Sequence, residues 1–235
     1  MLPKIATPKY DMIVPSTGET VTYRPYVVKE EKLLLIALES QSDEAIENAV
    51  VDIIKLCVET AIDINSLTTF DIEFMFVNLR AKAVGEGIKV NPPCKHCEEI
   101  NKDVKINLEK VIVKGLEEDI DMHVKLTDDI SIEVAWPTMK NKLTEEDMKT
   151  GTDTIINMIA RSIGTIYSGE ETFAASDSSK KELVEFVESL NTDQFNDLVD
   201  KVAEVPQLGY DLKFKCKACK KDNTLELKGL VDFFQ

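Results

Sequence analysis

The stretch Cys94-Lys95-His96-Cys97 has a counterpart, Cys216-Lys217-Ala218-Cys219, near the other end of the sequence. Each cysteine pair lies between two short runs in which apolar and polar residues alternate, which is the pattern of a β-strand. A Cys-x-x-Cys turn at the tip of a β-hairpin supplies two metal ligands, and a structural zinc ion needs four. The sequence therefore predicts one closed zinc site made by Cys94, Cys97, Cys216 and Cys219.

The two cysteine pairs are far apart along the chain, with 118 residues between Cys97 and Cys216. A metal ion bound by both pairs would tie the middle of the chain to its C-terminal region. Four thiolates fill the coordination shell of zinc, so a site of this composition is structural and leaves no position for water. His96 lies between the first two cysteines, but the cysteines already complete the shell. We therefore expect folding around the site to depend on the metal.

Two other uses of paired cysteines fit this sequence less well. A redox Cys-x-x-Cys motif has its first thiol at the N-terminus of a helix, whereas both pairs here precede charged turns and strand-like sequence. Disulfides suit secreted proteins, but the sequence begins without a hydrophobic signal segment, and its five cysteines leave one unpaired. The odd residue, Cys57, lies on the apolar face of a predicted helix and is expected to be a small core residue.

The composition indicates a globular protein whose partners are proteins. The 235 residues are 43% hydrophobic, and no apolar run approaches the roughly 20 residues that a membrane-spanning helix requires. The formal net charge is −15, which opposes the phosphate attraction that supplies most nucleic-acid affinity. We therefore expect no membrane and no nucleic acid as partner. Around the second cysteine pair, lysines can offset the negative charge of a tetrathiolate site or form a contact patch. These lysines are Lys213, Lys215, Lys217, Lys220 and Lys221.

Hydrophobic periodicity predicts blocks of helix on both sides of a β-rich centre. Helices are expected over residues 29–40, 43–57, 69–83, 144–163 and, in two pieces, 179–205. Strands are expected beside each cysteine pair and at residues 20–24, 111–113, 122–126 and 130–136. Asp43 is a good N-cap for the second helix, and Thr192 or Asp193 for the last. Residues 169–178 are expected to form a polar loop.

Because the helices and strands do not alternate as β-α-β units, the predicted fold class is α+β. The helical segments pack around the β centre, and the two hairpins form one zinc site with four cysteine ligands. Residues 1–86 are expected to form a β-arm with a helical region, and residues 87–235 a β-rich zinc region with inserted helices, joined in one integrated fold. The sequence contains no phosphate-binding glycine loop, nucleophile elbow or histidine pair at metal spacing, so we do not expect an enzyme.

Several phrases of the sequence occur in a characteristic order. They are Pro15-Ser16-Thr17-Gly18, Tyr23-Arg24-Pro25-Tyr26, Val28-Lys29-Glu30-Glu31-Lys32, Phe70-Asp71-Ile72-Glu73, the run from Leu79 to Glu86, and the stretch from Phe214 to Phe234. In this order and spacing they resemble the baseplate hub proteins of T-even-like, contractile-tailed bacteriophages. The resemblance covers roughly half of the chain.

The resemblance implies a role in building the central hub of the phage baseplate. The chain would be either a subunit kept in the virion tail or an assembly factor acting in the host cytoplasm, with other baseplate hub proteins as its partners. One alternative is a zinc-ribbon factor that binds nucleic acid or takes part in transcription, which retention on a DNA column would favour. Another is a zinc- or thiol-dependent enzyme, which an exchangeable water on the metal would favour.

Aromatic residues in two segments are candidates for docking to partners. Tyr10, Tyr23 and Tyr26 lie in a proline-punctuated segment, residues 1–28, and Phe233 and Phe234 lie at the last residues of the sequence. Aromatic side chains of this kind often anchor protein interfaces, because they bury a large area. Burial in the chain's own core is the alternative for both segments.

Overall fold

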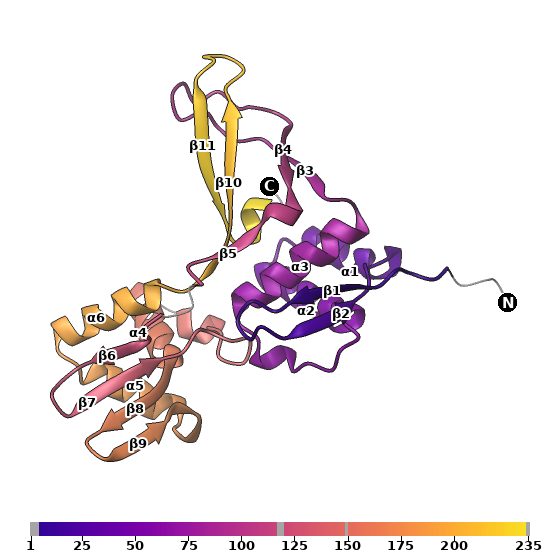
Figure 1. Cartoon of the computed structure of the whole chain (residues 1–235). Helices are drawn as coiled ribbons and strands as arrows, with labels where there is room; N and C mark the ends of the chain where they lie inside the picture. The colour runs from indigo at the N-terminus through magenta and orange to yellow at the C-terminus, as the bar shows by residue number, and fades with distance from the viewer. Residues whose placement is uncertain (1–4, 117–119, 149, 234–235) are drawn as a thin grey trace. The chain divides into compact units, whose positions relative to one another are not determined.

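The computed structural model describes residues 5–116, 120–148 and 150–233, which form two compact units (Figure 1). The first unit is drawn from residues 1–114 and 206–235, and the second from residues 115–205. Helices and strands occur in both units, so the fold class is α+β as predicted. The sequence-based division between residues 86 and 87 falls inside the first unit. Among the described residues, no helix combines the length and the apolar character that a membrane crossing needs.

Three helices form much of the first unit: α1 (Val28–Glu39), α2 (Asp43–Cys57) and α3 (Thr69–Ala83). The central helix is α3, which contacts α2 and also the strands β5 (Ile112–Lys114) and β10 (Gln207–Lys215). Its buried apolar residues do not keep to one stripe, as expected for a helix that is covered on several sides. They are Phe70, Ile72, Met75, Phe76, Val77, Leu79 and Ala81. Cys57 at the end of α2 is fully buried, as predicted, and burial raises the pKa of its thiol to about 11.

The strands of the first unit are antiparallel. They form the hairpins β1 (Tyr10–Ile13) with β2 (Thr20–Tyr23), β3 (Gly87–Val90) with β4 (Val104–Asn107), and β10 with β11 (Asp222–Lys228). Strand β5 pairs with β10, so residues on either side of the second unit in sequence share one sheet. Short 3-10 helices cover Ile64–Ser66, Leu108–Lys110 and Val231–Phe233.

The C-terminal residues of the first unit pack onto α3. Phe233 is only 2% exposed and belongs to a core cluster with Val77 of α3 and Leu208 and Leu212 of β10. The backbone N–H of Leu230 donates a hydrogen bond of 3.1 Å to Oε1 of Glu73 on α3. Both contacts attach this segment to the helix.

The second unit is a four-stranded antiparallel sheet with three helices. The strands occur in the order β6 (His123–Lys125), β7 (Ile130–Val134), β8 (Ile163–Ser168) and β9 (Glu171–Ala174). The helices are α4 (Gly151–Ser162), α5 (Lys180–Glu188) and α6 (Thr192–Ala203), and short 3-10 helices cover Glu145–Met148 and Ala175–Asp177. A core cluster that includes Ile132, Ile159 and Leu198 joins sheet and helices.

Part of the second unit differs from the sequence-based expectation. Residues 169–178 were expected to be a polar loop, but residues 171–174 are strand β9, which pairs with β8 through a turn at Gly169 with a φ of 59°. The polar side chains misled the prediction because β9 is an edge strand, which needs little apolar character. The predicted β centre is also divided, because β3 to β5 belong to the first unit and β6 and β7 to the second.

Two helix starts and one helix interior also differ from the expectation. The N-caps of α2 and α6 are Ser42 and Asn191, each one residue before the earliest predicted cap. In both cases the side-chain oxygen accepts a hydrogen bond from a backbone N–H in the first turn. The helix predicted over residues 144–163 is interrupted, because the Thr150 side chain caps a new helix at Gly151.

The buried end of Glu73 makes stability depend on pH. Burial raises the pKa of this carboxyl, although the N–H of Leu230 acts to lower it. The folded state therefore holds the proton more tightly than the unfolded state, and stability falls as the pH rises from the ordinary pKa of glutamate to the raised one. Glu73→Gln keeps the acceptor oxygen and should stabilise the protein at pH 7, because the amide has no charge to be desolvated.

Urea unfolding at pH 4 and pH 7 measures this effect. The stabilisation should be present at pH 7 and small at pH 4, where the wild-type carboxyl is largely protonated. Glu19→Gln, in an exposed turn, is the matched control and should change stability little. A Glu73→Gln protein that is less stable than wild type at pH 7 would contradict the prediction.

Candidate metal centre

The tips of the β3–β4 and β10–β11 hairpins bring the four predicted ligands together (Figure 1). All four Sγ atoms lie within 4.8 Å of one another. The shortest approaches cross between the hairpins, at 3.6 Å from Cys94 to Cys219 and 3.7 Å from Cys97 to Cys216. Segments that are 118 residues apart in sequence thus share one cluster of sulfur atoms.

These distances distinguish between the uses of cysteine considered above. A tetrahedron with Zn–S bonds of about 2.3 Å places neighbouring sulfurs about 3.8 Å apart. A disulfide needs an S–S distance of about 2.05 Å, and all four cysteines are free thiols. Neither pair lies at the N-terminus of a helix. The arrangement therefore has the donor set and spacing of a closed tetrathiolate zinc centre.

The two cysteine turns have the same backbone conformation. In each turn the carbonyl of the first cysteine accepts a hydrogen bond from the N–H four residues later, at 2.9 Å and 3.1 Å. The N–H of the same cysteine donates to the carbonyl five residues later, at 2.9 Å in both turns. The residues four positions after the first cysteine, Glu98 and Lys220, both have a φ of 60°, in the left-handed region. The hairpins therefore present their sulfurs in equivalent ways.

Two buried asparagines join the hairpins reciprocally. Oδ1 of Asn223 accepts a hydrogen bond of 3.0 Å from the N–H of Lys95, and Oδ1 of Asn101 accepts one of 2.8 Å from the N–H of Lys217. Asn101 is 1% exposed and Asn223 5% exposed. Each asparagine thus belongs to one hairpin and supports the turn of the other. We call this pair the asparagine clasp.

The asparagine clasp was not predicted, although the sequence contains a signal for it. Both asparagines lie seven residues after the first cysteine of their own turn, so the repeated pattern is Cys-Lys-x-Cys-x-x-x-Asn. In each hairpin the asparagine amide also donates to the carbonyl two residues earlier, at 3.0 Å and 3.1 Å. The two hairpins therefore repeat both the sequence pattern and its hydrogen bonds.

The surroundings of the sulfurs favour the thiolate form in two of the four cysteines. Burial acts to raise the pKa of Cys94, but the backbone N–H groups of His96 and Cys97 lower it to about 6. The pKa of Cys216 is also lowered, chiefly by the backbone N–H of Cys219. Thiolate is the form that binds a metal.

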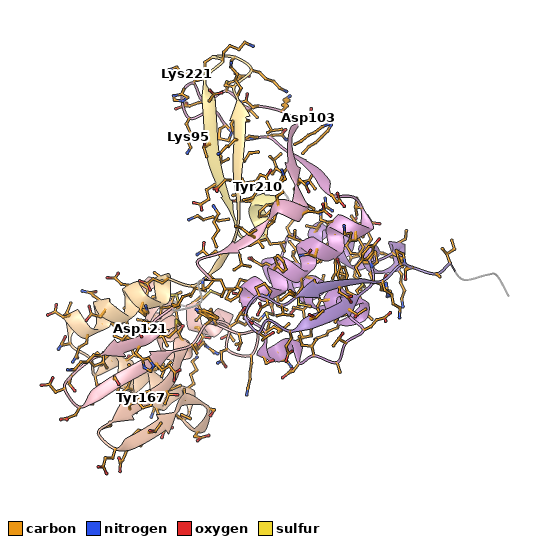
Figure 2. All side chains as sticks on the ribbon, viewed as in Figure 1. Lys95, Asp103, Asp121, Tyr167, Tyr210 and Lys221 are labelled. Atoms are coloured by element: carbon orange, nitrogen blue, oxygen red, sulfur yellow. The ribbon has the colours of Figure 1, made fainter. Side chains whose placement is uncertain are left out.

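Lysines surround this end of the first unit, as the labels of Lys95 and Lys221 indicate (Figure 2). Nζ of Lys217 donates to the carbonyl of Lys102 at 2.6 Å, and Nζ of Lys220 donates to the carbonyl of Lys217 at 2.6 Å. Both ammonium groups thus fix the hairpin tips. A tetrathiolate zinc centre has a formal charge of about −2, which these lysines offset.

The candidate docking aromatics lie elsewhere in the first unit. Tyr23 and Tyr26 are 2% and 5% exposed, and Phe233 lies in the core cluster described above. Tyr10 is half-buried with its ring 5.9 Å from that of Tyr23, and Phe234 lies outside the described residues. For Tyr23, Tyr26 and Phe233, burial supports the alternative that they belong to the chain's own core.

Comparison with known proteins defines the class of this protein. Residues 7–235 match the family described as T4 bacteriophage base plate protein. Because the match covers nearly the whole chain, the chain belongs to this family of phage baseplate proteins. Neither a curated protein nor a solved structure matches it.

The asparagine clasp predicts that substituting either asparagine affects the opposite hairpin. Asn101→Ala should expose the N–H of Lys217 to hydrogen exchange, and Asn223→Ala should expose that of Lys95, because each substitution removes the acceptor supplied by the opposite hairpin. Leaving such a donor without an acceptor costs about 1–3 kcal/mol, equivalent to exchange roughly 5- to 150-fold faster. Asn65→Ala, at an exposed position, is the control. Faster exchange confined to the mutated hairpin itself would contradict the clasp.

Proposed function

We propose that this chain is a non-enzymatic structural or assembly protein of the phage tail baseplate hub. It acts by docking to other hub proteins and contains one structural zinc ion. The family match over residues 7–235 supports the baseplate role. The protein would assemble in the host cytoplasm and reside in the baseplate of the virion tail, or act there only during assembly.

The cluster of four sulfurs carries the zinc proposal. Its ligands are Cys94, Cys97, Cys216 and Cys219, which have the spacing of a tetrahedral site and come from equivalent turns. The metal would hold together two hairpins that are distant in sequence, which is an architectural task and not a catalytic one.

The exposed face of α1 supports docking to other proteins. Glu30, Leu34 and Ala37 are the buried residues of this helix, and the opposite face carries exposed apolar side chains. Val28 is 79% exposed and Ile36 54% exposed. The neighbouring exposed apolar residues are Val27, Leu33, Leu35 and Leu38. A helix that is apolar on both faces is typical of one that is buried in an assembly, and we propose that an apolar surface of another baseplate protein covers it.

The segment before β1 is a second docking element in this proposal. Ile5 is 95% exposed, and Ile13 at the end of β1 is 61% exposed. Tyr10 is the candidate aromatic anchor of this segment that keeps part of its side chain accessible. The alternative function of nucleic-acid binding receives no support from the family match or from the net charge of −15.

Metal analysis tests the zinc proposal. The purified protein should contain about one zinc per chain. Cys94→Ser and Cys216→Ser should both lose the metal and destabilise the same unit, whereas Cys57→Ala should keep the zinc content. If the protein is folded without metal and all four cysteines react with thiol reagents, the proposal fails. It also fails if one of the two serine variants is harmless and the other unfolds the protein.

Substitutions on α1 test the docking proposal. Leu35→Ser with Ile36→Ser, and deletion of residues 1–9, should leave zinc content and cooperative unfolding unchanged, because Leu35, Ile36 and Ile5 are exposed. Both changes should block hub assembly in infected cells, measured by the proteins that co-purify with the chain. Phe233→Ser is the contrasting variant, because it empties a core position and should cost about 3–5 kcal/mol of stability.

Complete, infectious tails produced with both exposed-surface variants would refute the docking proposal for these surfaces. Loss of assembly together with loss of zinc or of cooperative unfolding would assign the effect to folding instead.

A further inference from the structure

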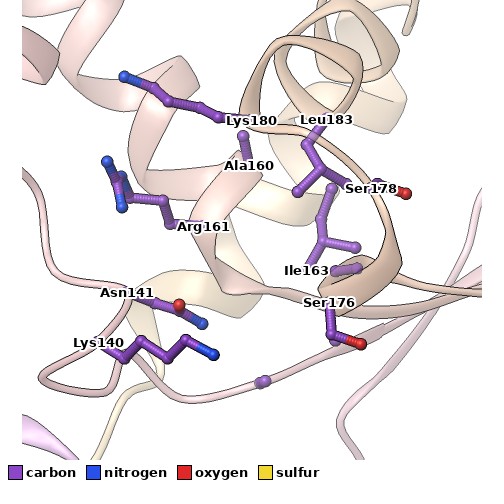
Figure 3. A pocket seen from close by; sticks show the side chains of 12 residues that line it. Lys140, Asn141, Ala160, Arg161, Ile163, Ser176, Ser178, Lys180 and Leu183 are labelled. Carbon is purple, nitrogen blue, oxygen red and sulfur yellow. The ribbon is translucent and has the colours of Figure 1, made fainter. Parts of the chain in front are cut away.

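The second unit contains a cavity of about 400 Å³ (Figure 3). This volume is in the range of about 300–1,000 Å³ that is usual for ligand pockets. Basic side chains, Lys140, Arg161 and Lys180, lie along one side of the view, and Ser176 and Ser178 along the other. They come from the loop after β7, the end of α4 and the start of α5.

The basic lining is unusual for this part of the chain. Residues 115–205 include 21 acidic and 8 basic residues, which gives a formal net charge of −13. Three of those eight basic residues line one cavity. A concentration of positive charge within an acidic unit would attract and select an anionic group.

A buried carboxylate holds two of the three basic residues in place. Asp147 is fully buried, and its Oδ2 accepts hydrogen bonds of 2.7 Å from Arg161 Nη2 and from the N–H of Thr144. Its Oδ1 accepts one from Nζ of Lys180. Although burial acts to raise it, these contacts hold the pKa of Asp147 well below its ordinary value. Asp147 therefore stays ionised and orients the basic side of the cavity.

Asp147 does not satisfy all the donors of the lining. Nε of Arg161 is buried and has no acceptor among the described residues. Within the described part of the chain, no carboxylate forms an ion pair with Lys140, which lies beside Asn141 (Figure 3). The hydroxyl of Ser176 donates a hydrogen bond of 3.2 Å to Oδ1 of Asp177.

The rest of the lining is apolar, with Ala160, Ile163 and Leu183 beside the basic residues. An oxyanion on a short aliphatic stem matches this combination of surfaces. We propose that the cavity binds a carboxylate side chain presented by a segment of a partner polypeptide, with Lys140 and Arg161 as the main donors. That the carboxylate belongs to a partner polypeptide rests on the proposed docking function. Binding of a carboxylate in the cavity depends on neither the zinc site nor α1.

Titration of the full-length protein with a minimal probe tests this proposal. The chain contains three arginines, so its Nε–Hε NMR region holds three signals, and Arg161→Lys identifies that of Arg161. Acetyl-Gly-Glu-Gly-amide should shift the Arg161 signal saturably, and the glutamine analogue should not. Lys140→Glu should weaken binding at least tenfold. Lys181→Glu is the same charge change outside the cavity lining, and it should leave the affinity for the peptide within twofold of the wild-type value.

Each other outcome overturns the proposal. The cavity does not bind carboxylates if the signal does not move, or if Lys140→Glu and Lys181→Glu act equally. Tighter binding of inorganic phosphate than of the glutamate peptide would assign the cavity to a small phosphate compound. If Lys140→Glu does not fold, Lys140→Gln is used, and a loss of less than threefold is the negative result. Co-purification of hub proteins is measured separately, so failure of the docking function is distinguishable from failure of this site.

Discussion

The junction between the two cysteine hairpins is the constraint on which the first unit depends. That unit is assembled from segments on either side of residues 115–205, and its closure brings together positions 118 residues apart. Closing a loop of this length costs about 4–5 kcal/mol in the chain-entropy estimate, which a cross-link removes from the unfolded state. The asparagine clasp acts at the same junction, and the β5–β10 pairing joins the two segments at the other end of β10. A metal ion bound by the four cysteines would add a cross-link to this junction.

A second set of polar contacts holds the β1–β2 hairpin and α1 to the other helices. Asp71 is fully buried at the start of α3 and accepts hydrogen bonds from the N–H and the hydroxyl of Ser16, at 2.9 Å and 2.5 Å. Glu30 is 2% exposed and accepts one of 2.9 Å from Arg24. Burying such carboxylates is costly unless their partners are correctly placed. These residues lie in the phrases that resemble baseplate hub proteins, so the resemblance follows structural contacts.

The parts of the structure that could be predicted are those set by local pattern or by ligand count. Four cysteines in two turns define a complete zinc shell without knowledge of the fold, and α3 could be recognised as a long apolar-rich run that ends before Gly85. Strand β9 could not be predicted, because its pairing with β8 and not its own composition makes it a strand. The sequence left burial of Phe233 as an alternative to docking, because the outcome depends on where this residue meets α3. The asparagine clasp was detectable as a repeat, but its crosswise hydrogen bonds exist only in the folded junction.

The distribution of charge separates the two units. Residues 115–205 account for −13 of the net charge of −15, so the first unit is close to neutral despite the lysines at its hairpin tips. The argument against nucleic acid as a partner therefore applies most strongly to the second unit. In the first unit, a zinc ion bound by four thiolates would have a formal charge of about −2 and would further reduce the effect of those lysines. The first unit instead exposes the apolar face of α1, which needs no charge to bind. Apolar contact through the first unit and selection of a carboxylate by the second are the two proposed kinds of recognition, and each can act without the other because one depends on buried apolar area and the other on charge.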